Sequence, residues 1–377
     1  MNPRLQHWRE AATLLLAAGA GCGAAARGRA RAPLGPFDYE VLLLQRSPHS
    51  GFLPSAHVFP GGLVEAADFS ADWLGLLPAS PRCGLGPVPG GGRAPLFATD
   101  RAGLGSPLPG DVAFRICAIR ETFEEAGVLL VLPGRGPPPG PAAPLPPARL
   151  PPAPELSAWR RRVQKDPAAF LQMCRQLRCA PNIWALHEWG NWLTPAGRGG
   201  RRYDTAFYLC CLRQRPHTAQ DEREVTGFRW SSPSEAIECF KSQEMWFAPP
   251  QFYELCRLCN FSSLDALHRF GSDRALEGCE RWMSVMLAAS NGHIQLLPGD
   301  ELYPEDPDYT GEKKMIWSTD KKVEDLMKEG SRLNRIVIKD LNRLAVYVNI
   351  QPKYKHINPI LMDSSLIGNN EDCNSRL

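Results

Sequence analysis

The stretch Arg120-Glu121-Thr122-Phe123-Glu124-Glu125-Ala126-Gly127-Val128 decides the fold. Glu121, Glu124 and Glu125 are spaced i, i+3 and i+4, so on a helix their side chains are neighbours. Three carboxylates on one patch repel one another unless a cation neutralises them, and an all-oxygen ligand set suits a hard ion such as Mg²⁺ or Mn²⁺. A charge run is more often a solvated helix face. On these residues alone both interpretations stay open.

The residues around this stretch predict the helix itself. At about 100° per residue, one face collects the apolar side chains of Val112, Ile116, Ile119 and Phe123. The three carboxylates fall on the opposite face. We expect Asp111 to cap the N-terminus of this helix and Gly127 to supply the left-handed residue that ends it.

The order Arg-Glu, two residues, Glu-Glu, one residue, Gly and an aliphatic residue resembles the second half of the signature of the Nudix hydrolase family. The family's first half is Gly, five residues and an acidic residue, placed seven residues before the Arg. At that spacing this chain has Ser106 and Val112, but upstream Gly62 and Asp68 are separated by five residues. Because 51 residues lie between Asp68 and Arg120, the signature looks split by an insertion, as in peroxisomal coenzyme A diphosphatases of this family.

This resemblance implies an α+β fold, a Nudix-type α/β/α sandwich with an insertion inside the signature and a C-terminal extension. We assign residues 1–260 to the Nudix domain, with the insertion at 69–110 and a Pro/Gly-rich linker at 134–154. Residues 261–374 are the predicted extension, which contains a hairpin of two apolar runs, 336–338 and 344–350.

The resemblance also implies hydrolysis of a phosphoric anhydride with a divalent ion, Mg²⁺ or Mn²⁺. Glu121, Glu124 and Glu125 are then the metal-binding carboxylates, and Arg120, Glu121 and Glu124 form the catalytic group. Arg120 is expected to orient its acidic neighbours by charge-assisted hydrogen bonds. The shorter Asp68 stands where the family has Glu. Many family members recruit a further general base from a later loop. Glu222 and Glu224 are the nearest candidates here, although a charge on the surface is the more usual role for such residues.

A coenzyme A signature precedes some Nudix boxes, and this chain matches it in part. The substrate-binding residues aligned with it are Arg46, Ser47, Gly61 and Gly62, and the chain departs from it at Leu44, Gly51 and Ser55. Coenzyme A and its acyl esters are therefore the expected substrates. Two alternatives remain: NAD(H), a nucleotide sugar or capped RNA as substrate, or a non-catalytic Nudix-fold binding module.

The composition and the C-terminal residues restrict the partners and the compartment that we expect for this protein. A formal net charge of +3 on 377 residues makes nucleic acid an unlikely partner. No apolar run approaches the roughly 20 residues that span a bilayer. Scattered cysteines, 12 in all, are typical of a reducing compartment. Ser375-Arg376-Leu377 resembles the Ser-Lys-Leu address, which predicts a peroxisomal location and a peroxisomal import receptor as partner.

Three further segments carry predictions. Residues 12–18 are either the core of a leader peptide or a first buried strand followed by a second at 39–46, and we favour the strand. Residues 128–132 are predicted as a strand, and residues 155–177 as an exposed amphipathic helical element whose arginines, 160–162, are solvated.

Overall fold

The computed structural model describes residues 8–20, 37–77, 107–133, 152–195, 202–309, 316–340, 343–360 and 362–363. Three sequence-based predictions fall wholly or mainly outside these ranges. They are the targeting tripeptide at 375–377, most of the insertion and most of the linker.

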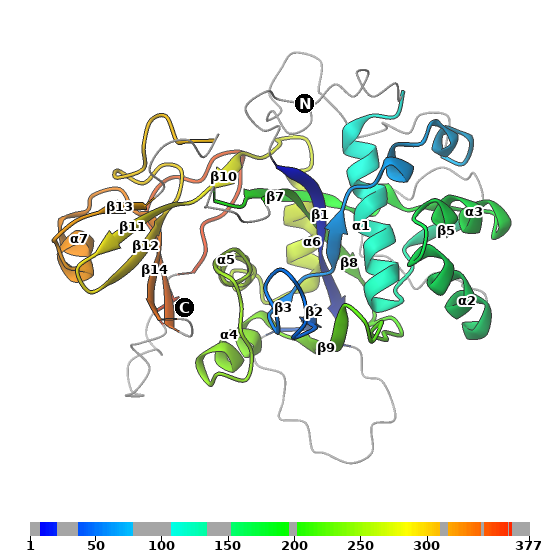
Figure 1. Cartoon of the computed structure of the whole chain (residues 1–377), viewed down its shortest axis with the longest axis horizontal. Helices are drawn as coiled ribbons and strands as arrows, with labels where there is room; N and C mark the ends of the chain where they lie inside the picture. The colour runs from blue at the N-terminus through cyan, green and yellow to red at the C-terminus, as the bar shows by residue number, and fades with distance from the viewer. Residues whose placement is uncertain are drawn as a thin grey trace.

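A mixed sheet of eight strands forms the centre of the larger part of the molecule (Figure 1). Its strands are β1 (Arg9–Gly19), β2 (Tyr39–Arg46), β3 (His57–Val58), β4 (Gly61–Leu63), β7 (His187–Leu193), β8 (Tyr203–Leu212), β9 (Val225–Ser231) and β10 (Arg281–Met283). The strand order is β10-β7-β8-β1-β2-β3, with β4 also paired to β1 and β9 to β2. β1 runs parallel to β8 along one edge, while its other edge pairs with β4 and then with β2. Because β4 pairs with β1 in this way, the Gly61-Gly62 turn lies against the edge of the sheet.

β1 and β2 are buried on both faces, which explains their nearly continuous apolar sequences. Leu14 and Leu16 of β1 enter one core, while Leu15 and Ala17 enter the other. The same alternation holds along β2. The predicted strands at 12–18 and 39–46 are confirmed.

The helix α1 (Gly110–Ala126) covers one face of the sheet, and its predicted apolar face is buried there. Gly127 ends the helix in the left-handed conformation, at φ 69°, as expected. The N-terminal cap differs from the prediction. Pro109 takes the capping position and Asp111 lies inside the first turn, because the helix begins two residues earlier than the sequence pattern indicated.

Beyond α1 lie α2 (Ala153–Val163) and α3 (Ala168–Gln176), at the right of Figure 1. The prediction of one exposed amphipathic element was wrong. A break at Asp166-Pro167 separates two helices, and Trp159, Val163 and Phe170 are buried in the core beneath α1. The strand predicted at 128–132 was also misplaced. The observed strand begins three residues later, as β5 (Val131–Pro133), which pairs with β6 (Cys179–Pro181). Val128, Leu129 and Leu130 before it are buried in the core.

The opposite face of the sheet is covered by α4 (Pro233–Lys241), α5 (Pro249–Leu258) and α6 (Leu264–Asp273). Helices on both faces of a mixed sheet confirm the α/β/α sandwich. The domain boundary predicted at residue 260 stays a prediction. We note that α6 and β10, both C-terminal to it, belong to this sandwich.

A second sheet lies at the other end of the molecule from α2 and α3 (Figure 1). Its strands are β11 (Val285–Ala289), β12 (Gly292–Leu296), β13 (Ile316–Ser318), β14 (Asn334–Asp340), β15 (Arg343–Val348) and β16 (Met362–Asp363), and α7 (Val323–Glu329) packs on it. β14 and β15 form the predicted hairpin. In the described part of the chain, no helix has the length and apolar character needed to cross a membrane.

Candidate active site

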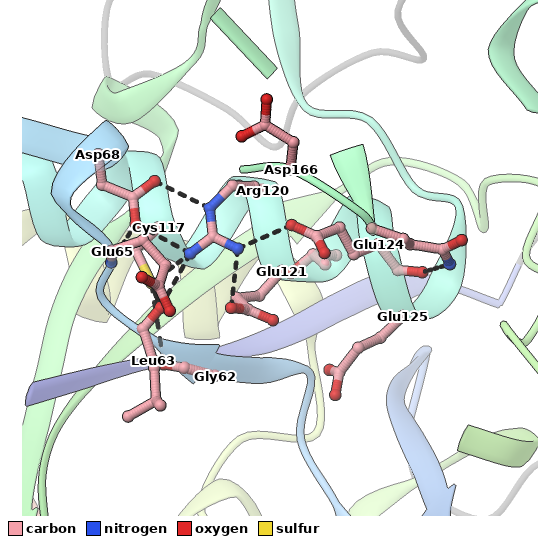
Figure 2. Close-up of polar contacts among 12 residues, drawn as sticks. Gly62, Leu63, Glu65, Asp68, Cys117, Arg120, Glu121, Glu124, Glu125 and Asp166 are labelled. Atoms are coloured by element: carbon pink, nitrogen blue, oxygen red, sulfur yellow. Dashed lines mark hydrogen bonds and ion pairs between the residues drawn. The ribbon is translucent and has the colours of Figure 1, made fainter. Parts of the chain in front are cut away.

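Arg120, only 1% exposed, is the centre of the candidate site (Figure 2). Its guanidinium makes a bidentate pair with Asp68, from Nε to Oδ1 at 2.9 Å and from Nη2 to Oδ2 at 2.9 Å. Nη2 also donates to the carbonyl oxygen of Leu63 at 2.9 Å. A planar fork of this kind suits two parallel hydrogen bonds to one carboxylate, so Arg120 is locked in orientation.

The remaining nitrogen of Arg120 reaches two of the signature carboxylates. Nη1 donates to Oε1 of Glu121 at 2.8 Å and to Oε1 of Glu124 at 2.7 Å. A guanidinium carries five N–H groups, and here each has an oxygen acceptor. Arg120 therefore orients both carboxylates, in the way the resemblance implies.

The glycine turn lies directly against these carboxylates. The backbone N–H of Gly61 donates to Oε2 of Glu125 at 2.9 Å. A Cβ built on Gly62 would lie 2.5 Å from the carboxylate carbon of Glu121, and one on Gly61 would lie 2.4 Å from the carbonyl oxygen of Ala12 in β1. A side chain at Gly61 would clash with the backbone of β1, and one at Gly62 would displace the Glu121 carboxylate. Glycines therefore let the turn fit between β1 and the signature helix with the carboxylate in place.

Asp68 acts here as a support for Arg120. It lies at the end of a short 3₁₀ helix, Ala66–Phe69, and is 1% exposed. Besides its two bonds to Arg120, its Oδ2 accepts from the backbone N–H of Glu65 at 2.9 Å. Both carboxylate oxygens are thus occupied by the protein. The shorter side chain relative to the usual Glu fits this packed position, where the sequence alone left its role undecided.

The carboxylate cluster is short of positive charge. Burial raises the pKa of Glu121 to about 7, against the opposing effect of Arg120, and the charge of Glu124 raises it further. Burial and then the charge of Glu121 raise the pKa of Glu125 well above its ordinary value. Burial also raises the pKa of Glu124. A site with these properties favours a cation, which would stabilise the charged carboxylates.

The donor set fits a hard divalent ion, although the side chains do not already converge on one point. No cluster of three or more His, Cys, Asp or Glu side chains poised around a metal position occurs among the described residues. Arg120 holds one oxygen each of Glu121 and Glu124. In the described structure the second oxygens of Glu121 and Glu124, and Oε1 of Glu125, accept no hydrogen bond. Those oxygens are the ones available to an ion.

The predicted substrate-binding residues Arg46 and Ser47 lie at the end of β2. Nε of Arg46 donates to the carbonyl oxygen of Phe52 at 3.0 Å, and Nη2 donates to Oγ of Ser50 at 2.6 Å. The charge of Arg46 lowers the pKa of Glu125, which places the guanidinium within electrostatic reach of the site. The Ser47 hydroxyl is buried and accepts from the N–H of His49, so it shapes the turn that holds Arg46.

The two candidates for a general base outside the helix differ in position. The charge of Glu224 raises the pKa of both Glu124 and Glu125, and its carbonyl oxygen accepts from the N–H of Ser47 at 2.8 Å. Glu222 instead accepts a hydrogen bond from Gln220 on the surface. Of the two, Glu224 lies near the carboxylate cluster.

Two contacts near the site were missed by the sequence-based reasoning. Arg160 and Gln164, from α2 and the residue that follows it, both reach the signature helix. The buried Trp159 and Val163 beside them are the pattern that indicates a packed helix, although they do not reveal its neighbour. Trp189 and Trp192 are buried in the core on the other face of the sheet.

A carboxylate-bearing helix, its central arginine and a Gly-Gly turn on a mixed sheet together define a Nudix hydrolase domain. The chain belongs to the NUDT19 family, since residues 8–258 match the NUDT19 Nudix domain and residues 286–349 the NUDT19 C-terminal domain. Nudix hydrolases generally use divalent metal ions.

Relatives and a solved structure extend this comparison. The chain is 70% identical to "Acyl-coenzyme A diphosphatase NUDT19" of Gallus gallus, with 100% of each chain covered. It is 52% identical to the Homo sapiens protein of the same name, over 95% of this chain and 96% of that one. A Nudix hydrolase from Alicyclobacillus acidocaldarius is 24% identical with a TM-score of 0.48, covering 68% of this chain and 92% of that one.

Proposed function

We propose that this protein hydrolyses the diphosphate of coenzyme A and acyl-coenzyme A, releasing 3′,5′-ADP and 4′-phosphopantetheine or its acyl ester. The observation that carries this proposal is the full-length similarity, at 52% and 70% identity, to two proteins named acyl-coenzyme A diphosphatase. The complete set of Arg120, Glu121, Glu124 and Glu125 supports catalysis over a mere binding role, because a binding module gains nothing from a repulsive carboxylate cluster.

Mg²⁺ or Mn²⁺ is the proposed cofactor, held by Glu121, Glu124 and Glu125, and when bound it would neutralise the charge of the diphosphate and activate the attacking water. The chain's own contribution is positional. Arg120 holds Glu121 and Glu124 in place, and the N–H of Gly61 holds Glu125. Gly62 leaves room for the Glu121 carboxylate beside the turn.

Arg46 is the proposed cation for a phosphate group of coenzyme A. In the described structure its Nη1 makes no hydrogen bond, whereas its Nε and Nη2 are held by Ser50 and Phe52. A guanidinium fixed in this way recognises phosphate oxygens at little further entropic cost. The backbone of Gly61 and Gly62 completes the proposed substrate contacts.

Product analysis by mass spectrometry tests the substrate class. The purified protein with Mg²⁺ or Mn²⁺ is given equal amounts of coenzyme A, acyl-coenzyme A, NADH and a nucleotide sugar. We expect 3′,5′-ADP from the first two, and loss of turnover in Glu125→Gln. Preferred cleavage of NADH or the sugar would keep the site but overturn the substrate. A wild-type protein without any turnover would favour a Nudix-fold binding module.

We also propose a peroxisomal location, on the basis of Ser375-Arg376-Leu377 at the end of the sequence. A fluorescent protein fused to the N-terminus of the full chain is expected to enter peroxisomes through the import receptor. The same fusion without residues 375–377 is expected to stay in the cytosol. Equal peroxisomal signal from both fusions would contradict the role of the tripeptide.

A further inference from the structure

The last turn of the signature helix receives two side chains from outside the Nudix signature. Nε of Arg160 and Nε2 of Gln164 each donate to the carbonyl oxygen of Glu124, both at 2.9 Å. Glu124 and Glu125 occupy this turn, at the edge of the carboxylate cluster (Figure 2). The contact therefore acts on the backbone that carries two of the three carboxylates.

The carbonyl of Glu124 needs such partners because the helix ends just after it. The final carbonyls of a helix have no N–H donor in the following turn. Here the N–H of Gly127 bonds to the carbonyl of Phe123, and the side chains of Arg160 and Gln164 supply donors for the next one. A cation at this end also opposes the negative pole of the helix dipole.

Arg160 differs from the arginines beside it. Arg161 and Arg162 are exposed, and Arg162 stacks on the ring of Trp159 at 4.0 Å from its centroid. Arg160 is half-buried, and its Nη2 is closed off from solvent without a hydrogen-bond partner among the described residues. Arg160 therefore faces the signature helix, whereas Arg161 and Arg162 are exposed.

The space for Arg160 is made by Gly127. A Cβ at Gly127 would lie 3.2 Å from Nη1 of Arg160, tighter than most side-chain contacts. Burial lowers the pKa of Arg160, while the charges of Asp221, Glu125 and Glu124 raise it, so its guanidinium lies within electrostatic reach of the site. Arg160 thus interacts with the signature helix in two ways: it donates a hydrogen bond to the carbonyl of Glu124, and its positive charge lies near Glu124 and Glu125.

We propose that Arg160, together with Gln164, is a positioning residue of the active site: it fixes the backbone of Glu124 and so the aim of the Glu124 and Glu125 carboxylates. This inference rests on the proposed metal-dependent diphosphatase function. It assigns α2, which follows the Pro/Gly-rich linker, to the catalytic apparatus.

The test compares Arg160→Ala and Gln164→Ala with the matched control Arg161→Ala, taken from the same helix and exposed. Binding of Mn²⁺ to the full chain is measured by electron paramagnetic resonance of the free ion, and kcat and KM for coenzyme A are measured separately. Thermal melting of every variant reports on folding. We expect Arg160→Ala to lose about 10-fold or more in Mn²⁺ affinity and in kcat, the range typical when a group supporting a metal ligand is removed. KM is expected to stay near the wild-type value.

Gln164→Ala is expected to move the same quantities in the same direction, by less, because a neutral donor is lost. If Arg160→Ala does not fold, the proposal is tested by comparing the Mn²⁺ affinity and kcat of Gln164→Ala with those of the control Arg161→Ala. Mn²⁺ affinities equal to the control in folded variants would overturn the positioning role while leaving the diphosphatase function intact. A wild-type protein that neither binds Mn²⁺ nor cleaves coenzyme A would overturn the function itself, and the positioning role with it.

Discussion

Arg120 sets the geometry of the site because all of its N–H groups donate hydrogen bonds within the protein. Each of its five N–H groups has an oxygen acceptor, shared among Asp68, Leu63, Glu121 and Glu124. A lysine has a single ammonium and no planar fork, so it would leave several of these acceptors without a donor. Because Arg120 is saturated, it has no N–H to spare for a substrate phosphate. Its role is to hold carboxylates.

Replacement of Gly62 by alanine tests the close approach of the turn to Glu121. The new Cβ would lie 2.5 Å from the carboxylate, which has to move away. Because the displaced group is the end of a flexible side chain, we expect melting to change little. Coenzyme A hydrolysis is expected to fall about 100-fold or more, as is typical when a catalytic group is moved by about 1 Å.

Gly75→Ala is the matched control, since a Cβ there would meet no atom within 4 Å. Both variants are compared by steady-state kinetics and by differential scanning fluorimetry. Equal activity of the two proteins would contradict the proposed fit between the turn and the carboxylate.

The raised pKa values of the carboxylates predict an unusual pH dependence of stability without metal. Folding raises the pKa of Glu121 from 4.5 to about 7, so between these values the folded state binds more protons than the unfolded state. The contribution of Glu121 to stability is therefore present below pH 4.5 and lost as the pH rises through about 7. We expect the free energy of unfolding of the metal-free protein to fall over this range.

Urea unfolding at several pH values, with EDTA or with Mg²⁺, measures this effect. Mg²⁺ is expected to raise stability more at pH 8 than at pH 5, since protons and the ion compete for the same oxygens. Glu121→Gln should weaken the pH dependence in EDTA without abolishing it, because the pKa values of Glu124 and Glu125 are also raised. A stability that instead rises from pH 5 to 8 in wild type but not in this variant would contradict the assignment.

At the scale of elements, one ion pair joins two segments that the insertion separates in sequence. Asp68 follows the glycine turn, and Arg120 lies in α1, with side chains 1% and 2% exposed. The pair holds together the two segments that flank the insertion, and the insertion is tolerated because loop closure depends only weakly on length. The split signature is thus one site in space.

Asp68→Ala is expected to destabilise the protein by about 3–5 kcal/mol, the usual cost of removing one partner of a buried ion pair. Activity should fall as well, because Arg120 loses the support that aims it. Asp72→Ala is the control. Asp72 pairs with Arg175 at the surface, with side chains 59% and 49% exposed, and its loss is expected to cost at most about 1 kcal/mol. Chemical unfolding measures both, and equal losses would contradict the buried role of Asp68.

The sequence predicts those elements whose periodicity is local. The apolar face of α1 and the two-sided burial of β1 and β2 follow directly from residue spacing. The contact of Gly62 with Glu121 follows only from the family resemblance. Two contacts could not be predicted from the sequence: the hydrogen bond from Arg160 to Glu124 and the ion pair of Asp68 with Arg120. Both join residues far apart in sequence, and neither composition nor spacing specifies such a partner.

At the scale of the whole molecule, the two sheets share one core, so the C-terminal extension is part of the fold. Residues of β14 and β15 are buried with those of α5 in the same hydrophobic cluster. Polar contacts cross this junction too. The hydroxyl of Tyr253 donates to Oδ1 of Asn334 at 3.1 Å, and Nε2 of His356 lies 2.7 Å from the carbonyl oxygen of Trp189. On the same side of the sheet, the indole N–H groups of Trp189 and Trp192 in β7 each donate a hydrogen bond to the carboxylate of Glu254 in α5.

A shared core predicts that the Nudix sandwich and the second sheet unfold together. Scanning calorimetry of the full chain is expected to give one transition whose calorimetric and van't Hoff enthalpies agree. Asn334→Ala removes the acceptor of Tyr253 and is expected to lower the midpoint of that single transition, at a cost of about 1–3 kcal/mol. Trp317→Ala, on the exposed edge strand β13 with Trp317 41% exposed, is the control and should leave the midpoint nearly unchanged. Two separate transitions, with only the second moved by Asn334→Ala, would mean that the active-site domain does not depend on the sheet attached to it.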